Sequence, residues 1–238
     1  MRWPFRLPAL LLILALAGCA VSAPPPSGPQ PGQPGQPRTV TPSGEQVSRF
    51  RSVVARVEPV AERICQRQNP GGNCDFKIVV DDRPGQPANA FQTLDRSGRP
   101  ILAFTTALIA DVRNPDELAF VMSHEAAHHI AGHIPRQRQN AMTGAILLGG
   151  LASLSGASSG AIDAAVDLGA SVGARSYSKD FELEADAIGT IIAKESGFDP
   201  VRGAEFFTQI PDPGDRFLGT HPPNAQRMEI VRRVAASL

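Results

Sequence analysis

Residues 114–132 read NPDELAFVMSHEAAHHIAG, and this stretch predicts the central helix of the fold. Asn114 is a favourable N-cap, Pro115 suits the first helical position, and the acidic residues that follow match the positive end of the helix dipole. A helix is therefore expected from here to about Gly132. Apolar residues surround its polar second half on all sides, which indicates that the helix is buried.

His124 and His128 lie four positions apart, so they share one face of this helix. Two imidazoles at this spacing can bind one zinc ion, and Glu125 beside them can act as the general base that activates water. The alternative is a pair of structural histidines satisfied within the core. Burying two histidines and a glutamate is costly unless something pairs with them, and a metal would do so.

The third ligand is expected from a second helix, over residues 181–196. One known extension of the motif would need glycine at 131 and histidine at 134, but this chain has Ala131 and Ile134 there. Glu182 and Asp186 share a helical face, so Glu182 could bind the metal while Asp186 orients a ligand histidine. Glu184 should face away from them. The alternative is an ordinary solvated acidic helix start.

His129 and His133 lie off the register of the metal-binding pair. They are expected behind the ligands or at the rim of the site.

The first 18 residues have the features of an export signal, with Arg2 and Arg6 ahead of an apolar run. The run ends in Leu-Ala-Gly-Cys at Cys19, which resembles the bacterial lipoprotein signal, with acylation of Cys19. The alternative is an ordinary secretory signal with a chance cysteine. Residues 19–44 are rich in Pro and Gly and are expected to form an extended tether, followed by one domain over residues 45–238.

The other two cysteines, Cys65 and Cys74, flank a predicted turn. After export, a disulfide between them is favoured over two free buried thiols. The 238 residues carry a formal net charge of zero, which argues against a nucleic-acid-binding surface.

Apolar periodicity predicts a helix over residues 45–68, with a kink or break at Pro59. Strands are expected over residues 76–80, 90–94 and 99–105, the last two as a hairpin. Residues 141–173 are rich in small residues and nearly free of charge, so two helices are expected there. Packing within the core is favoured, and a membrane-contacting or mobile flap is the alternative.

Three ordered motifs together resemble the zinc metallopeptidase family of HtpX, the CAAX prenyl protease and the mitochondrial Oma-type protease. They are HEAAH at 124–128, ELEAD at 182–186, and THPP at 220–223 followed by Arg227. The soluble, exported lipoprotein branch is the most similar. The resemblance implies an α+β, zincin-like (gluzincin) domain, mostly helical, with a small antiparallel-edged sheet packed on the helix that carries HEAAH.

By this resemblance, His124, His128 and Glu182 match the zinc ligands and Glu125 matches the base. Asp186 matches the carboxylate that orients a ligand histidine, and Arg227 is expected to pair with Asp186 or with a substrate group. His221 matches a residue that approaches the site, as an oxyanion donor or a plug on the metal. As a further alternative, His221 is a loop histidine before a helix.

The sequence therefore predicts a zinc-dependent endopeptidase in the periplasm, lipid-anchored to the outer membrane, that degrades unfolded or misassembled envelope proteins. The extended substrate is expected to pair with the strand at 101–106. The alternative from another class is a zinc-containing chaperone or assembly lipoprotein without proteolytic activity. A peptidoglycan-interacting lipoprotein is a further alternative that no sequence feature supports.

Overall fold

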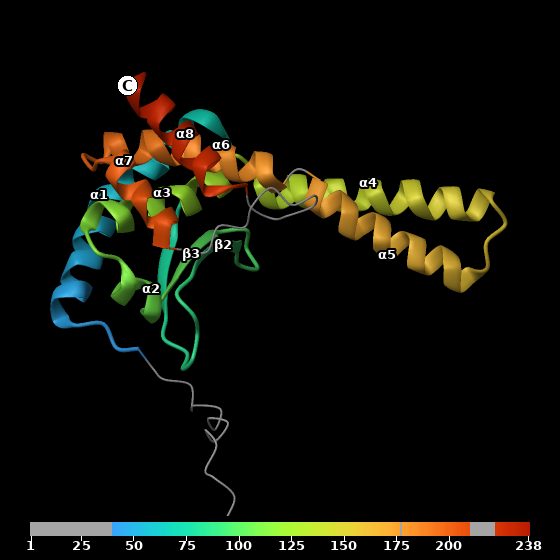
Figure 1. The fold of residues 1–238 in the computed structure, drawn as a ribbon, viewed down its shortest axis with the longest axis horizontal. Helices are drawn as coiled ribbons and strands as arrows, with labels where there is room; N and C mark the ends of the chain where they lie inside the picture. The colour runs from blue at the N-terminus through green and yellow to red at the C-terminus, as the bar shows by residue number, and fades with distance from the viewer. Residues whose placement is uncertain (1–39, 177, 210–221) are drawn as a thin grey trace, which may run out of the picture. The chain divides into compact units, whose positions relative to one another are not determined.

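The computed structural model describes residues 40–176, 178–209 and 222–238 (Figure 1). The expected signal over residues 1–18, Cys19 and His221 lie outside this part of the chain, as does most of the expected tether. The elements follow in this order: α1 (Gly44–Gln68), β1 (Lys77–Asp81), β2 (Ala90–Leu94), β3 (Pro100–Thr105), α2 (Thr106–Asp111), α3 (Pro115–Ile130), α4 (His133–Leu154), α5 (Ser159–Ser176), α6 (Ser178–Glu195), α7 (Pro200–Ala204), the 3₁₀ helix η1 (Glu205–Gln209) and α8 (Asn224–Ala236).

Within the described residues, three strands form one mixed sheet in the order β1-β3-β2. β3 pairs with β1 in parallel and with β2 in antiparallel register, so the predicted hairpin is confirmed. The connecting turn has Gly98 at φ +84°, a conformation that glycine adopts without strain. Because β3 has a strand on each side, the expectation that it pairs with substrate was wrong, and β2 is the edge strand beside the helices.

The main core cluster lies between α1, α3, α6 and the sheet. α3 begins as its sequence predicts, with the Asn114 side chain accepting hydrogen bonds from the backbone N–H groups of Asp116 and Glu117. α1 continues through Pro59, so a break of the helix at this residue was wrong. Cys65 at the end of α1 forms a disulfide with Cys74, which ties this helix to the segment that enters β1.

α6 packs across α3 at the level of the predicted ligands. Gly189 on α6 makes this possible, because a Cβ there would lie 3.1 Å from the backbone nitrogen of His124 and 3.2 Å from its Cα. The two backbones therefore approach more closely than side chains would allow, and one turn of α6 is brought against the histidine-bearing turn of α3.

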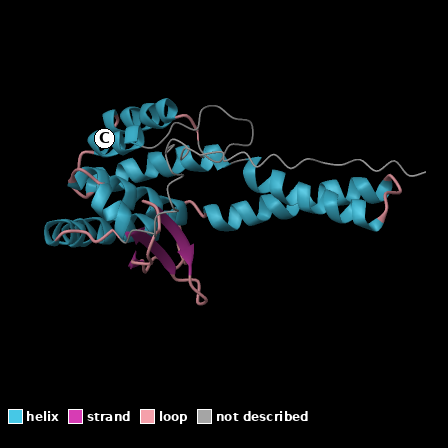
Figure 2. Ribbon diagram, turned by 60° about the horizontal axis from the view of Figure 1, so that its bottom comes forward, coloured by secondary structure: helices cyan, strands magenta, loops and turns pink. Residues whose placement is uncertain are grey.

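α4 and α5 form an antiparallel pair that extends away from the sheet, as both ribbon views show (Figures 1 and 2). They meet backbone to backbone at Gly144 and Gly169, where a Cβ on either would collide with the carbonyl oxygen of the other. The helices expected here are thus present, but they pack on each other and not within the core. Their outer surface carries exposed apolar side chains: Met142, Ile146, Leu147, Leu151, Leu154 and Leu168.

Among the described residues, no helix combines the length and the hydropathy that crossing a membrane requires.

Candidate active site

The three predicted metal ligands converge in one cluster. His124 Nε2 lies 3.0 Å from His128 Nε2, and the carboxylate of Glu182 lies 3.5 Å from the first nitrogen and 3.4 Å from the second. These atoms form a group that could hold a metal ion. Two ligand atoms bound to tetrahedral zinc would be about 3.3 Å apart, so the spacing suits this metal.

The donor set also fits zinc chemically. Two imidazole nitrogens and one carboxylate are the ligands of many catalytic zinc sites, in which the fourth position stays open for water or substrate. His124 and Glu182 are buried and His128 is partly buried. Burial makes the charge of Glu182 costly unless a cation lies next to it, and a metal ion would supply one.

Glu125 lines a cavity of about 720 Å³ that also contains the three ligands. One wall of this cavity is the segment from Ala88 to Gln92, which includes the first half of β2. Phe206 and Phe207 of η1 line it as well. The carboxylate of Glu125, the candidate metal ligands and β2, an edge strand among the described residues, therefore all border the same cavity.

His124 is held from the side opposite the cluster. Its Nδ1 lies 2.9 Å from Asp186 Oδ1, so Asp186 accepts the proton that this nitrogen carries. Arg227 of α8 donates two hydrogen bonds to the same carboxylate, both 2.7 Å long, and its guanidinium lies 3.7 Å from the centre of the Phe207 ring. The pairing of a buried carboxylate with a buried guanidinium fixes both groups.

The carboxylates beside His124 give it a pKa unlike that of an ordinary histidine. Burial lowers the pKa of His124, but the hydrogen bonds to Asp186 and Glu182 outweigh it and raise the pKa to about 10. Without a metal, His124 is therefore a cation between two carboxylates. A metal ion must displace this proton in order to bind, and metal affinity should fall as the pH falls.

His128 is held differently. Its Nδ1 lies 2.7 Å from His133 Nδ1, and His133 Nε2 lies 3.2 Å from Glu184 Oε2. The same oxygen accepts a 2.7 Å hydrogen bond from Arg136 Nη1. A line of side chains thus leads from the ligand His128 to the protein surface at Arg136.

Sequence reasoning missed this line of contacts. Glu184 lies outside the ligand cluster, as its helical position indicates, but it does not simply face away, because it contacts His133 and Arg136. His129 lies away from the site, since its ring contacts the backbone oxygen of Asn73 at 2.7 Å. The only available signal was a histidine five positions after His128, which does not reveal its partner.

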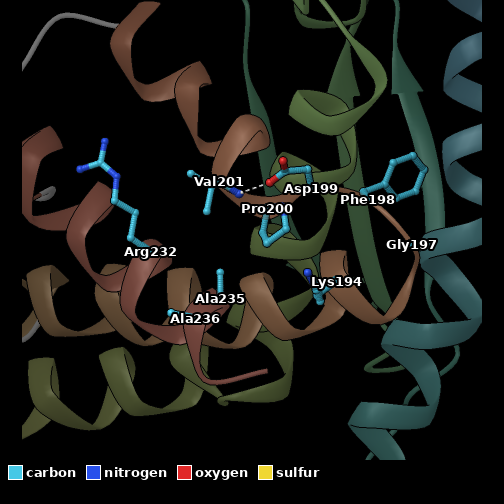
Figure 3. Close-up of a pocket in the computed structure, with 9 residues that line it drawn as sticks. All are labelled: Lys194, Gly197, Phe198, Asp199, Pro200, Val201, Arg232, Ala235 and Ala236. Carbon is cyan, nitrogen blue, oxygen red and sulfur yellow. Dashed lines mark hydrogen bonds between the residues drawn. The ribbon is translucent and has the colours of Figure 1, made fainter.

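A second cavity, of about 620 Å³, lies apart from the ligands between the end of α6, α7 and α8 (Figure 3). Its lining includes Lys194, Phe198 and Arg232, and Asp199 there caps α7 by accepting from Val201 N. Asp199 serves as this helix cap, and Lys194 and Arg232 are exposed surface residues. The candidate site is therefore the cavity that contains Glu125.

The model of peptidase family M48 matches residues 48–235, which is most of the chain and includes every residue of the cluster. None of the curated proteins matches.

Proposed function

Because the chain belongs to peptidase family M48, a family of zinc metallopeptidases, we propose that it is an endopeptidase acting on unfolded or misassembled proteins of the cell envelope. The observation that carries this proposal is the convergence of His124, His128 and Glu182 beside Glu125, in a cavity bordered by β2, an edge strand of the sheet that the described residues form.

In this proposal, His124 and His128 hold the zinc through Nε2 and Glu182 holds it through its carboxylate. When bound, zinc polarises the scissile carbonyl and lowers the pKa of a coordinated water. Glu125 takes the proton from that water and passes it to the departing amine nitrogen. Asp186 keeps the proton of His124 on Nδ1, so that Nε2 stays free to bind the metal.

The edge strand supports a preference for extended chains. Among the described residues β2 is paired only on the side of β3, and its other side borders the cavity. A substrate strand could add to this edge through main-chain hydrogen bonds, which tolerate many side-chain sequences. An unfolded chain can present an extended segment along much of its length, which is the reason for proposing unfolded proteins.

The cellular location is proposed from the sequence alone. The lipoprotein-like motif that ends at Cys19 and the Pro- and Gly-rich residues after it favour export and lipid anchoring, with the outer membrane as the destination. Radiolabelled palmitate incorporation into the wild type, and its loss in Cys19→Ser, is the test. Labelling that persists in the variant would contradict the anchor.

The catalytic proposal is tested by comparing the wild type with Glu125→Gln for bound zinc and for cleavage of a reduced, unfolded protein. Glu125 is not a ligand, so the variant should retain zinc and its fold while cleavage falls by at least about 100-fold. If the unmutated protein binds zinc and suppresses aggregation but cleaves nothing, the alternative of a zinc-containing chaperone is correct.

A further inference from the structure

The two ligand histidines have different neighbours on the nitrogen that faces away from the ligand cluster. Nδ1 of His124 lies against a buried carboxylate, that of Asp186. Nδ1 of His128 lies 2.7 Å from a second imidazole, that of His133. His133 is not itself part of the metal-binding group, because it lies on the far side of the His128 ring from Nε2.

The fold holds His133 firmly. It is the first residue of α4 and follows Gly132, which has a φ of +65° and separates this helix from α3. Its ring stacks on Phe181, with centroids 4.5 Å apart and an angle of 11° between the rings. The side chain is 5% exposed, and its Nε2 lies 3.2 Å from Glu184. Phe181 and Glu184 flank the ligand Glu182 on α6.

The proton positions in this arrangement follow from the chemistry of the imidazoles. A metal on His128 Nε2 requires that the ring proton sit on Nδ1, which can then donate only to His133 Nδ1. His133 Nδ1 must therefore be the acceptor, so the proton of His133 sits on Nε2. That nitrogen faces the carboxylate of Glu184, which accepts it. Each donor thus meets one acceptor.

We propose that His133 and Glu184 are positioning residues of the metal centre, which fix the ring orientation and the tautomer of His128. The inference rests on the proposed metallopeptidase function. Arg136 completes the arrangement by donating to Glu184 from the outside, where its guanidinium also lies 4.4 Å from the centre of the Phe181 ring. The start of α4 is therefore part of the support of the metal site.

The measurement is zinc affinity, by competition with a chromogenic chelator, for the folded full-length protein and its variants. Removing a partner of this kind weakens metal binding by about 10- to 100-fold, which is the loss expected for His133→Ala. His133→Asn should restore most of the affinity, because its side-chain oxygen occupies nearly the position of Nδ1. Glu184→Ala should weaken binding, and Glu184→Gln, which still offers an oxygen, should weaken it less.

A spectroscopic readout separates positioning from general loss of stability. With Co²⁺ in place of zinc, the visible absorption bands depend on ligand orientation, so they should shift in His133→Ala and return towards the wild-type position in His133→Asn. His129→Ala is the matched control: it removes the neighbouring histidine, whose ring contacts the Asn73 backbone instead. It should leave zinc affinity and the spectrum unchanged.

A folded His133→Ala that binds zinc and Co²⁺ as the wild type does would overturn the proposal while leaving the peptidase function intact. If that variant fails to fold, the half-exposed Glu184 gives the same test through Glu184→Ala. A wild-type protein that binds no zinc would overturn both proposals.

Discussion

Arg227 and Asp186 form a buried ion pair with two parallel hydrogen bonds, each 2.7 Å long, between α8 and α6. The guanidinium is 5% exposed and the carboxylate is fully buried. Because Asp186 also holds His124, the C-terminal helix is connected to the metal site through this pair.

Replacing Arg227 with Met should therefore destabilise the protein by about 3 kcal/mol, since the buried Asp186 loses the guanidinium that pairs with it and keeps only its contact with His124. For a chain of this size that corresponds to a fall in Tm of about 6 to 12 °C. Calorimetry of the zinc-loaded protein measures it. The double variant Arg227→Met with Asp186→Asn should recover part of the loss, because no unpaired charge remains.

Arg232→Met is the control for this experiment. Arg232 lies one and a half turns further along α8, where it is exposed at the second cavity (Figure 3). Its replacement should change Tm by no more than a degree or two, in keeping with a loss of about 0.5 kcal/mol or less. An equal effect of both substitutions would refute the role given to the Asp186 pair.

Gly189→Ala should weaken zinc binding with little change in stability. The added methyl group would meet the backbone of Ser123 and His124 at 3.1 to 3.3 Å, so α6 must move by a few tenths of an ångström and carry Glu182 with it. The overpacking costs about 1 kcal/mol, which the higher helix propensity of alanine offsets. Chelator competition should show several-fold weaker binding.

Gly150→Ala on α4 provides the matched comparison, because nothing lies within 4 Å of a Cβ at this position. It should raise stability by about 0.5 to 1 kcal/mol and leave zinc binding unchanged. Unaltered zinc affinity in Gly189→Ala would mean that the close approach of α3 and α6 does not control the ligand geometry.

Gln92→Pro on β2 should slow cleavage of unfolded proteins. Asn89 accepts a ladder hydrogen bond from Thr105, and because such bonds alternate along an antiparallel strand, the N–H of Gln92 faces away from β3. Proline removes this donor, and losing one substrate hydrogen bond lowers kcat/KM by about 10-fold. Gln92→Ala keeps the N–H and should cleave like the wild type. If both variants behave alike, substrate does not pair at this position.

The zinc-free protein should lose stability on acidification because of His133. Burial lowers the pKa of His133 and the neighbouring His128 lowers it further, to about 4, despite the contact with Glu184. The pKa in the unfolded chain is near 6.5, so between these values the unfolded state binds more protons. The stability that the neutral His133 gives the folded protein is therefore fully present above pH 6.5 and is lost as the pH falls towards 4.

Thermal unfolding in a chelator at pH 7 and pH 4.5 measures this effect. The wild type should lose on the order of 1 kcal/mol more than His133→Asn over this range, or about 2 to 4 °C in Tm, because the variant has no imidazole to titrate there. A parallel loss in both proteins would assign the acid sensitivity to other groups.

Gly169→Ala should open the α4–α5 pair without affecting the metal centre, because its Cβ would collide with the Gly144 backbone. Hydrogen exchange in α4 and α5 should become faster, while zinc affinity stays at the wild-type value. Gly160→Ala, on the same helix with nothing within 4 Å, should leave exchange unchanged. A loss of zinc in Gly169→Ala alone would show that the pair and the site are coupled.

The features that sequence predicted well are local ones. The start of α3 follows from Asn114 and Pro115, whose effect on the backbone does not depend on distant residues. The sharing of one helix face by His124 and His128 follows from the helical period, and the family resemblance is confirmed by the match over residues 48–235.

The features that it missed depend on pairing between distant segments. The sequence of a strand does not reveal which strands lie next to it. That β3 lies in the middle of the sheet and β2 at an edge therefore could not be predicted. A helical wheel gave the side of α6 on which Glu184 lies, but not that His133 would meet it there. The glycines of residues 141–173 indicated close helix contact, but not that the contact was between α4 and α5 alone.

The antiparallel arrangement of α4 and α5 has a consequence for how this chain can change over time. α4 departs beside α3 and α5 returns beside α6, so the stretch between His128 and Glu182 begins and ends at the same place. Adding or deleting a whole turn in both helices at once would leave the ligands where they are. Insertions and deletions should therefore occur in α4 and α5 together and with equal length. The residues next to His128 and Glu182, where the two helices begin and end, should keep their spacing.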